Sequence, residues 1–156
     1  MRKLPGALTS TLLTVGLAAS FTPLLASPAA AASMHGCSAP QMCLYEGSYA
    51  NGSIIGRFQS VGYQNLPPSI QNEADAVANT RNDSVWLLDT GPSPDAYLCI
   101  PADTAVNLGT YAHPVSARGT WANDVDTIVI WGASDDGKCS GTDQVQQGRV
   151  PNGWRP

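Results

Sequence analysis

The sequence predicts an all-β protein, a sandwich of two Greek-key motifs that is stabilised by disulfide bonds. The segments that look ordered are short, are rich in β-branched and aromatic residues, and are separated by turn residues at close intervals. No long stretch keeps a helical period. Four cysteines follow an apolar leader, which favours disulfides in an oxidising compartment.

The chain opens with a segment, residues 1–32, that is typical of a secretory signal peptide. Met1-Arg2-Lys3 gives the basic start, an apolar stretch over residues 7–26 follows, and a run of small residues ends at Ala32. A membrane anchor is the alternative, but prolines at positions 5, 23 and 28 interrupt the segment. We therefore expect cleavage near Ala32, a secreted, extracellular product, and no later membrane span.

Candidate strands follow one another along the remaining chain, each bounded by turn residues. They cover residues 42–46, 53–59, 62–66, 76–79, 84–89, 96–100, 105–109 and 127–131. These strands define one domain over residues 33–131. Residues 132–156 are rich in glycine, proline and glutamine, and are expected to form an irregular C-terminal tail tethered by a disulfide.

The two halves of this domain align with each other in order. Residues 43–46 correspond to 86–89, 53–58 to 95–100, 63–66 to 105–108, and 72–77 to 123–128. Each half would be a four-stranded Greek key, and two such units can bury their apolar faces against each other. The alternative is the ordinary similarity between strands of any β protein.

The cysteines are Cys37, Cys43, Cys99 and Cys139, and they allow three pairings. Cys37 and Cys43 enclose five residues of a turn-like segment, which favours a local bridge and leaves Cys99 to pair with Cys139. A zinc site is the alternative, but the sequence has no Cys-x-x-Cys pair and no paired histidines.

Composition and motifs exclude several classes of function. With Arg2 and Lys3 removed with the signal, six basic residues face twelve acidic ones, which argues against nucleic acid and anionic membranes as partners. The two histidines, His35 and His113, stand in no hydrolase or metalloprotease motif. We therefore expect a protein that is not an enzyme and needs no cofactor, and we expect a monomer.

The residues from Cys37 onward resemble a known family. The matching features are Cys37-x5-Cys43-Leu44-Tyr45, then Tyr49 and Gly52, then Tyr63-Gln64-Asn65-Leu66, and then the segment 72–79. They are similar to the peptidase inhibitor family typified by the Streptomyces metalloproteinase inhibitor. The resemblance implies a βγ-crystallin-like fold and a secreted inhibitor of thermolysin-like zinc metalloproteases, so that the partner is an extracellular protease.

The resemblance also implies where the inhibitor contacts its target. The family's reactive bond follows a cysteine in the second half, and the matching inhibitory loop here is Leu98, Cys99, Ile100 and Pro101. Ile100 would supply the aliphatic side chain that such proteases accept, and a disulfide at Cys99 would restrain the loop. Here the partner cysteine is distant in sequence, and the alternative is a buried strand with a structural disulfide.

The second hypothesis is a calcium-binding or structural βγ-crystallin-like module without inhibitory activity. The resemblance implies a possible Ca²⁺ site in the segment 123–127, with Asn123, Asp124 and Thr127 as ligands. The alternative is that these residues cap a tight turn. Among the aromatic residues, Trp121 and Trp154 lie outside the predicted strands and are the better candidates for the surface.

Overall fold

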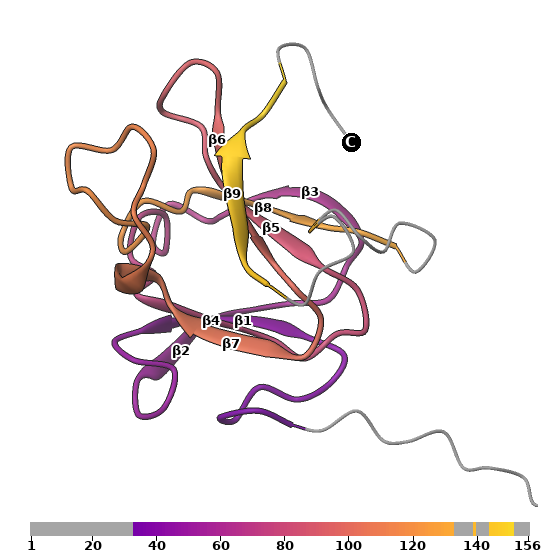
Figure 1. The fold of residues 1–156 in the computed structure, drawn as a ribbon. Helices are drawn as coiled ribbons and strands as arrows, with labels where there is room; N and C mark the ends of the chain where they lie inside the picture. The colour runs from indigo at the N-terminus through magenta and orange to yellow at the C-terminus, as the bar shows by residue number, and fades with distance from the viewer. Residues whose placement is uncertain (1–32, 133–138, 140–143, 152–156) are drawn as a thin grey trace, which may run out of the picture.

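The computed structural model describes residues 33–132, 139 and 144–151, which form two antiparallel sheets (Figure 1). The four-stranded sheet has the order β2 (Ser53–Phe58), β1 (Met42–Glu46), β4 (Ala76–Asn79) and β7 (Thr104–Asn107). The five-stranded sheet has the order β3 (Gly62–Asn65), β8 (Thr127–Ile130), β5 (Val85–Asp89), β6 (Ala96–Ile100) and β9 (Gln146–Arg149). The 3-10 turn η1 (Leu108–Thr110) follows β7. The predicted all-β class is confirmed.

Each half of the chain sends one strand into the sheet of the other half. Strands β1, β2 and β4 share one sheet, but β3 pairs with β8 in the second sheet. Strands β5, β6 and β8 share that second sheet, but β7 pairs with β4 in the first. The orders β2-β1-β4-β7 and β6-β5-β8-β3 therefore have equivalent members at equivalent places, with β9 added beside β6.

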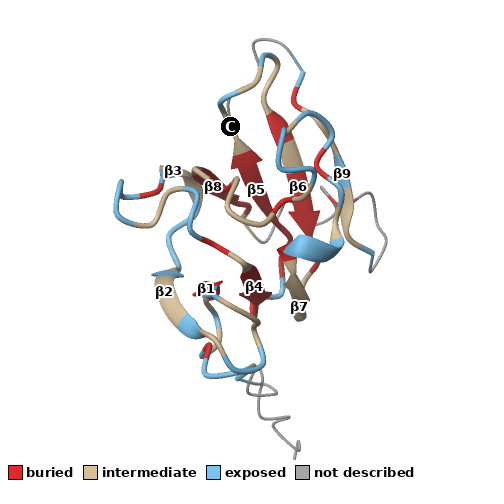
Figure 2. Ribbon diagram, turned by 90° about the vertical axis from the view of Figure 1, so that its left-hand side faces the viewer, coloured by how far each residue is buried: buried red, intermediate tan, exposed pale blue. Residues whose placement is uncertain are grey.

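The sandwich core forms because apolar side chains alternate along the central strands. In β1, Met42 and Leu44 enter the core between the sheets, whereas Cys43 and Tyr45 pack on the outer face. In β5 the side chain of Leu87 faces inward and that of Trp86 faces outward. Both faces of these strands are buried, and Figure 2 accordingly shows β4, β5 and β6 mostly in red.

A disulfide packs on the outer face of each of the two sheets. Cys37–Cys43 packs with Tyr45 and the small side chains of β4, and Cys99–Cys139 packs with the aromatic side chains of β5 and β6. Both expected pairings are present. The described residues hold no free cysteine.

The strand β9 lies in the segment that was expected to be irregular. Its backbone pairs with β6, with Gly148 opposite Tyr97, so the expectation is wrong over Gln146–Arg149. The sequence Gln-Gln-Gly-Arg has little intrinsic preference for a strand. Pairing arises because β6 offers an open edge and the Cys99–Cys139 bridge holds the chain beside it. The sheet thus extends beyond residue 131.

Two other expectations concern the ends of the chain and the aromatic residues. The predicted signal peptide, residues 1–32, and Trp154 lie outside the described residues. Trp121 was expected at the surface, but its side chain is fully buried in the core between the sheets, so that expectation is wrong. Nowhere in the described part of the chain does a helix have the length and hydropathy needed to cross a membrane.

Candidate functional site

The segment predicted to be the inhibitory loop is an interior strand. Leu98, Cys99 and Ile100 have 0% exposure in β6, and Pro101 is also buried. The strand pairs with β5 on one side and with β9 on the other, so both of its backbone edges are occupied. A substrate-like loop must be accessible to a protease, and the expectation of a presented loop at these residues is therefore wrong.

The physical reason lies in the side chains of the segment itself. Leu98 and Ile100 point into the core between the sheets, and Cys99 points to the outer aromatic cluster. An apolar run without a polar residue on either face is typical of a strand that is buried on both faces. Exposing Ile100 would open the centre of the fold.

Exposed aliphatic side chains are rare in the described part of the chain. The large hydrophobic residues that stand out are Val61, at 62% exposure, and Val115, at 47%. Val61 lies in the short connection between β2 and β3. Val115 lies in the long connection between η1 and β8, the orange loop that projects at the upper left of Figure 1.

The connection that carries Val115 is closed at its base like a hairpin. Ala112 and Thr120 form an isolated antiparallel bridge. Inside that bridge the amide of His113 donates to the carbonyl of Gly119 (3.1 Å). These bonds define the 113–119 loop, a seven-residue segment whose two ends are held together.

A buried histidine supports the 113–119 loop from within. The amides of Val115 and Ser116 both donate to Nδ1 of His113, at 3.2 and 2.9 Å. The His113 side chain has 0% exposure, and its ring lies 4.2 Å, centroid to centroid, from the ring of Trp121. The backbone next to the exposed Val115 side chain is thus fixed to the core.

Asp89, at the end of β5, faces the other nitrogen of this imidazole. Its Oδ2 atom lies 3.3 Å from Nε2 of His113, within ion-pair distance but without the geometry of a hydrogen bond. Burial raises the pKa of the Asp89 carboxyl, against the hydrogen bond that the Gly91 amide donates to it. Burial also lowers the pKa of His113, against the attraction of Asp89. The imidazole is therefore neutral at neutral pH.

Asp124 holds the second half of the loop. Its carboxylate accepts a hydrogen bond from the Ser116 hydroxyl, and Nη1 of Arg118 lies 3.2 Å from its Oδ1 atom. Arg118 also donates to the carbonyl of Asn123. The Arg118 side chain is 57% exposed, so its ion pair contributes little, and the Ser116 bond is the more important contact.

The residues predicted to bind Ca²⁺ do not converge on one point. Asn123 donates through Nδ2 to Asp75, Asp124 bonds Ser116, and the buried Thr127 hydroxyl contacts Oδ1 of Asn65 at 3.1 Å. Each side chain has a different protein partner. Across the residues that the structure describes, no group of three or more His, Cys, Asp or Glu side chains is placed to hold a metal ion.

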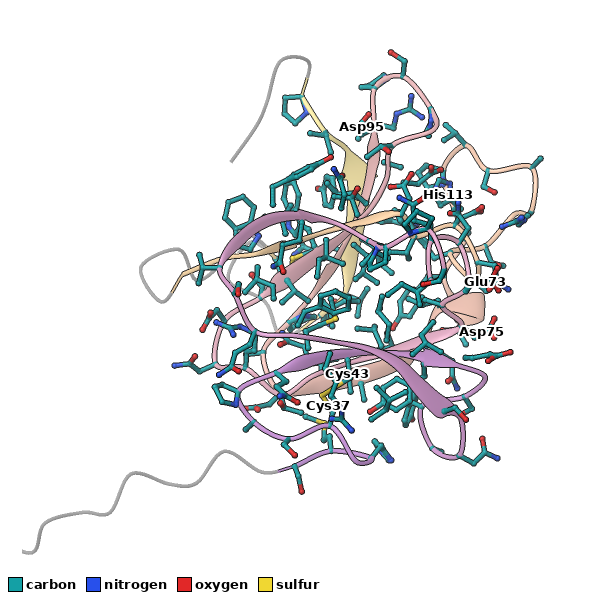
Figure 3. All side chains as sticks on the ribbon, turned by 180° about the vertical axis from the view of Figure 1, so that it is seen from behind. Cys37, Cys43, Glu73, Asp75, Asp95 and His113 are labelled. Carbon is teal, nitrogen blue, oxygen red and sulfur yellow. A yellow bond between two sulfur atoms is a disulfide. The ribbon has the colours of Figure 1, made fainter. Side chains whose placement is uncertain are left out.

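Sequence reasoning missed the residues that build this site. In the sequence, His113 stands outside any motif and Asp89 ends a predicted strand, and neither feature predicts a site. Their proximity depends on the path of a connection that returns to β5, and no spacing in the sequence encodes it. Figure 3 shows His113 at the end of the molecule that also carries Glu73 and Asp75.

Comparisons with known proteins add no assignment. No protein-family model matches the chain, and neither curated proteins nor solved structures give a match.

Proposed function

We propose that the protein is a secreted, βγ-crystallin-like peptidase inhibitor that contacts an extracellular zinc metalloprotease through the 113–119 loop. The strand orders support the fold, since two interlocked Greek keys would exchange their third strands in this way. The two disulfides fit an oxidising extracellular environment. The resemblance noted in the sequence supports the class of target.

The chemistry of such an inhibitor needs an aliphatic side chain on a restrained loop. A loop that is already fixed loses little conformational entropy on binding, so more of the contact energy appears as affinity. The 113–119 loop meets this need without a disulfide, because the His113 ring and the bridge at its base restrain it.

The observation that carries the proposal is the position of Val115. It is an exposed β-branched side chain whose own backbone amide is bonded to a buried group. We therefore assign to Val115 the contact role that the family resemblance implied for the disulfide-linked segment at Ile100. Val61 is the matched comparison, because it is also an exposed valine but lies away from this loop in the chain.

Two charge substitutions test the proposal. The protein is titrated against thermolysin as the probe, and Val115→Asp is expected to weaken inhibition by about thirtyfold or more, as for the loss of a central contact residue. Val61→Asp has the same change in size and charge and is expected to leave inhibition unchanged. Equal effects of the two substitutions, or stoichiometric protein without inhibition, would overturn the proposal.

A structural module, with or without bound Ca²⁺, is the second candidate, and the internal symmetry of the two halves favours it. Asn72 and Asn123 occupy equivalent places in the two halves, and both have positive φ, 57° and 60°. Their amides donate reciprocally to the carbonyls of Val125 and Ala74, at 2.7 and 2.8 Å. A rise in melting temperature on adding Ca²⁺, together with no inhibition, would support this candidate.

A further inference from the structure

We infer that His113 is a positioning residue that acts as an acid-sensitive clamp, so that protonation of its imidazole releases the 113–119 loop. The inference concerns regulation of the surface proposed above, and its consequence for inhibition rests on that proposed function. The clamp itself is a property of the fold and can be measured without any peptidase.

The hydrogen bonds of the ring determine its tautomer. Nδ1 accepts from two backbone amides, those of Val115 and Ser116, and so carries no hydrogen. The neutral ring therefore carries its hydrogen on Nε2, which faces Oδ2 of Asp89. A second proton can be added only at Nδ1.

Protonation at Nδ1 is incompatible with the closed loop. It would place a third N–H group against two backbone N–H groups that have no other acceptor among the hydrogen bonds of this loop. Both amide bonds would be lost together, and Val115 would lose its backbone support. The base of the loop would remain, because its bridge does not involve the imidazole.

The charges that face this ring come from three parts of the chain. Asp89 in β5 and Asp124 before β8 favour the imidazolium, whereas burial and Arg149 in β9 oppose it. Burial has the largest effect, and the pKa of His113 in the closed loop lies below the ordinary value of 6.5. Only the open loop, in which the ring is hydrated, has a histidine that titrates near that value.

The sign of the pH effect follows from this difference. A group whose pKa is lower in the closed state binds its proton more readily in the open state, so acid favours opening. The contribution of His113 to the stability of the closed loop is fully present above pH 6.5. This contribution decreases as the pH falls from 6.5 toward the lowered pKa of His113 in the closed state. The loop is thus held at neutral pH and released in acid.

Hydrogen exchange at the two clamped amides tests the inference. Between about pH 8 and about pH 5, the protection factors of Val115 and Ser116 are expected to fall by up to about tenfold for each pH unit below 6.5. The amides of β4, at the centre of its sheet, serve as the internal reference and are expected to keep their protection. Constant protection of these two amides across this whole pH range in the wild-type protein would overturn the inference.

Two histidine substitutions separate the clamp from general acid effects. His113→Asn keeps an acceptor oxygen at the place of Nδ1 but cannot titrate, so loop protection is expected to become independent of pH. His35→Asn removes the other histidine, which is exposed and lies beside Tyr49, and is expected to keep the wild-type pH dependence. If His113→Asn does not fold, the wild-type titration alone decides the outcome.

The same pH series separates failure of the clamp from failure of the proposed function. Acid release of the amides without inhibition at any pH would retain the clamp and reject the inhibitor. Inhibition that is abolished by Val115→Asp, with amide protection that does not depend on pH, would retain the inhibitor and reject the clamp.

Discussion

Asn79 joins residues 80–84, the link between the two halves, to the end of β6. Its side chain has 0% exposure and donates through Nδ2 to the carbonyls of Asp83 and Pro101, both at 2.8 Å. Its Oδ1 atom accepts from the amide of Arg81 at 3.2 Å. One amide side chain thus satisfies backbone groups from the link between the halves and from the end of β6.

Substituting Asn79→Ala would leave these buried backbone groups without partners. We expect the free energy of unfolding to fall by about 3 kcal/mol, because each buried unsatisfied group costs about 1 to 3 kcal/mol. A urea titration followed by tryptophan fluorescence measures the change. The exposed neighbour Asn82 is the control, and Asn82→Ala is expected to change stability by less than about 0.5 kcal/mol. Equal losses would show that the contacts of Asn79 do not matter.

Single residues also show why the predicted site was misplaced. The pattern Leu98-Cys99-Ile100 indicates a strand, and the structure contains one there, whereas the family resemblance implies a loop at the same residues. Exposure is decided by what packs on each face, and both covering layers come from distant segments. The clamp at His113 depends on a similar long-range return of the chain, and no local pattern indicates it.

At the scale of elements, the strand β9 depends on a close approach between a glycine and an aromatic ring. Gly148 lies opposite Tyr97, and a Cβ atom at Gly148 would lie 2.9 Å from the tyrosine ring. The ring cannot simply move away, because it also stacks on Trp86 with centroids 4.2 Å apart. The tyrosine ring is thus packed against both the glycine backbone and the indole.

Adding one methyl group at this glycine is therefore expected to disturb the outer aromatic cluster. Gly148→Ala should reduce stability by about 1 to 3 kcal/mol, as overpacking does, and should weaken the near-ultraviolet circular dichroism of the stacked rings. Gly109→Ala, where the added atom would meet only Ala122 at 3.9 Å, is the control and should cost less than about 1 kcal/mol. An unchanged spectrum for Gly148→Ala would contradict the stacking argument.

The elements themselves could be predicted where their own sequence determines them. The bounds of β1, β4 and β6 agree with the predicted strands, because runs of apolar and β-branched residues end at turn residues on both sides. The prediction for β7 continued to Gly109, but a 3-10 turn begins at Leu108. β9 was missed because a tether and an open edge, rather than its composition, make it a strand.

At the scale of the whole molecule, the two disulfides close loops of very different length. Cys37 and Cys43 are 6 residues apart, whereas Cys99 and Cys139 are 40 residues apart. In the chain-entropy description, the longer loop constrains the unfolded chain more and stabilises the fold more. The longer bridge also fixes Cys139, which precedes β9 in the chain.

Paired alanine substitutions measure this difference. Removing Cys99 and Cys139 together should lower the free energy of unfolding by about 4 kcal/mol, and removing Cys37 and Cys43 by about 2 kcal/mol. Thermal unfolding of the two double variants, under non-reducing conditions, gives the comparison. A larger loss for the short bridge would mean that outer-face packing of its sulfur atoms, rather than loop length, dominates.

The exchange of third strands has a consequence for assembly. Since every contact between the halves is also available to the halves of two different chains, domain swapping would preserve all of the strand pairings. The link at residues 80–84 decides between the two outcomes. There the buried Arg81 side chain binds the carbonyls of Pro40 and Gln59 and pairs with Asp83, which holds the link in its folded-back course. Conversion of the monomer to a domain-swapped dimer would therefore require this link to straighten, but it would not require the core to repack.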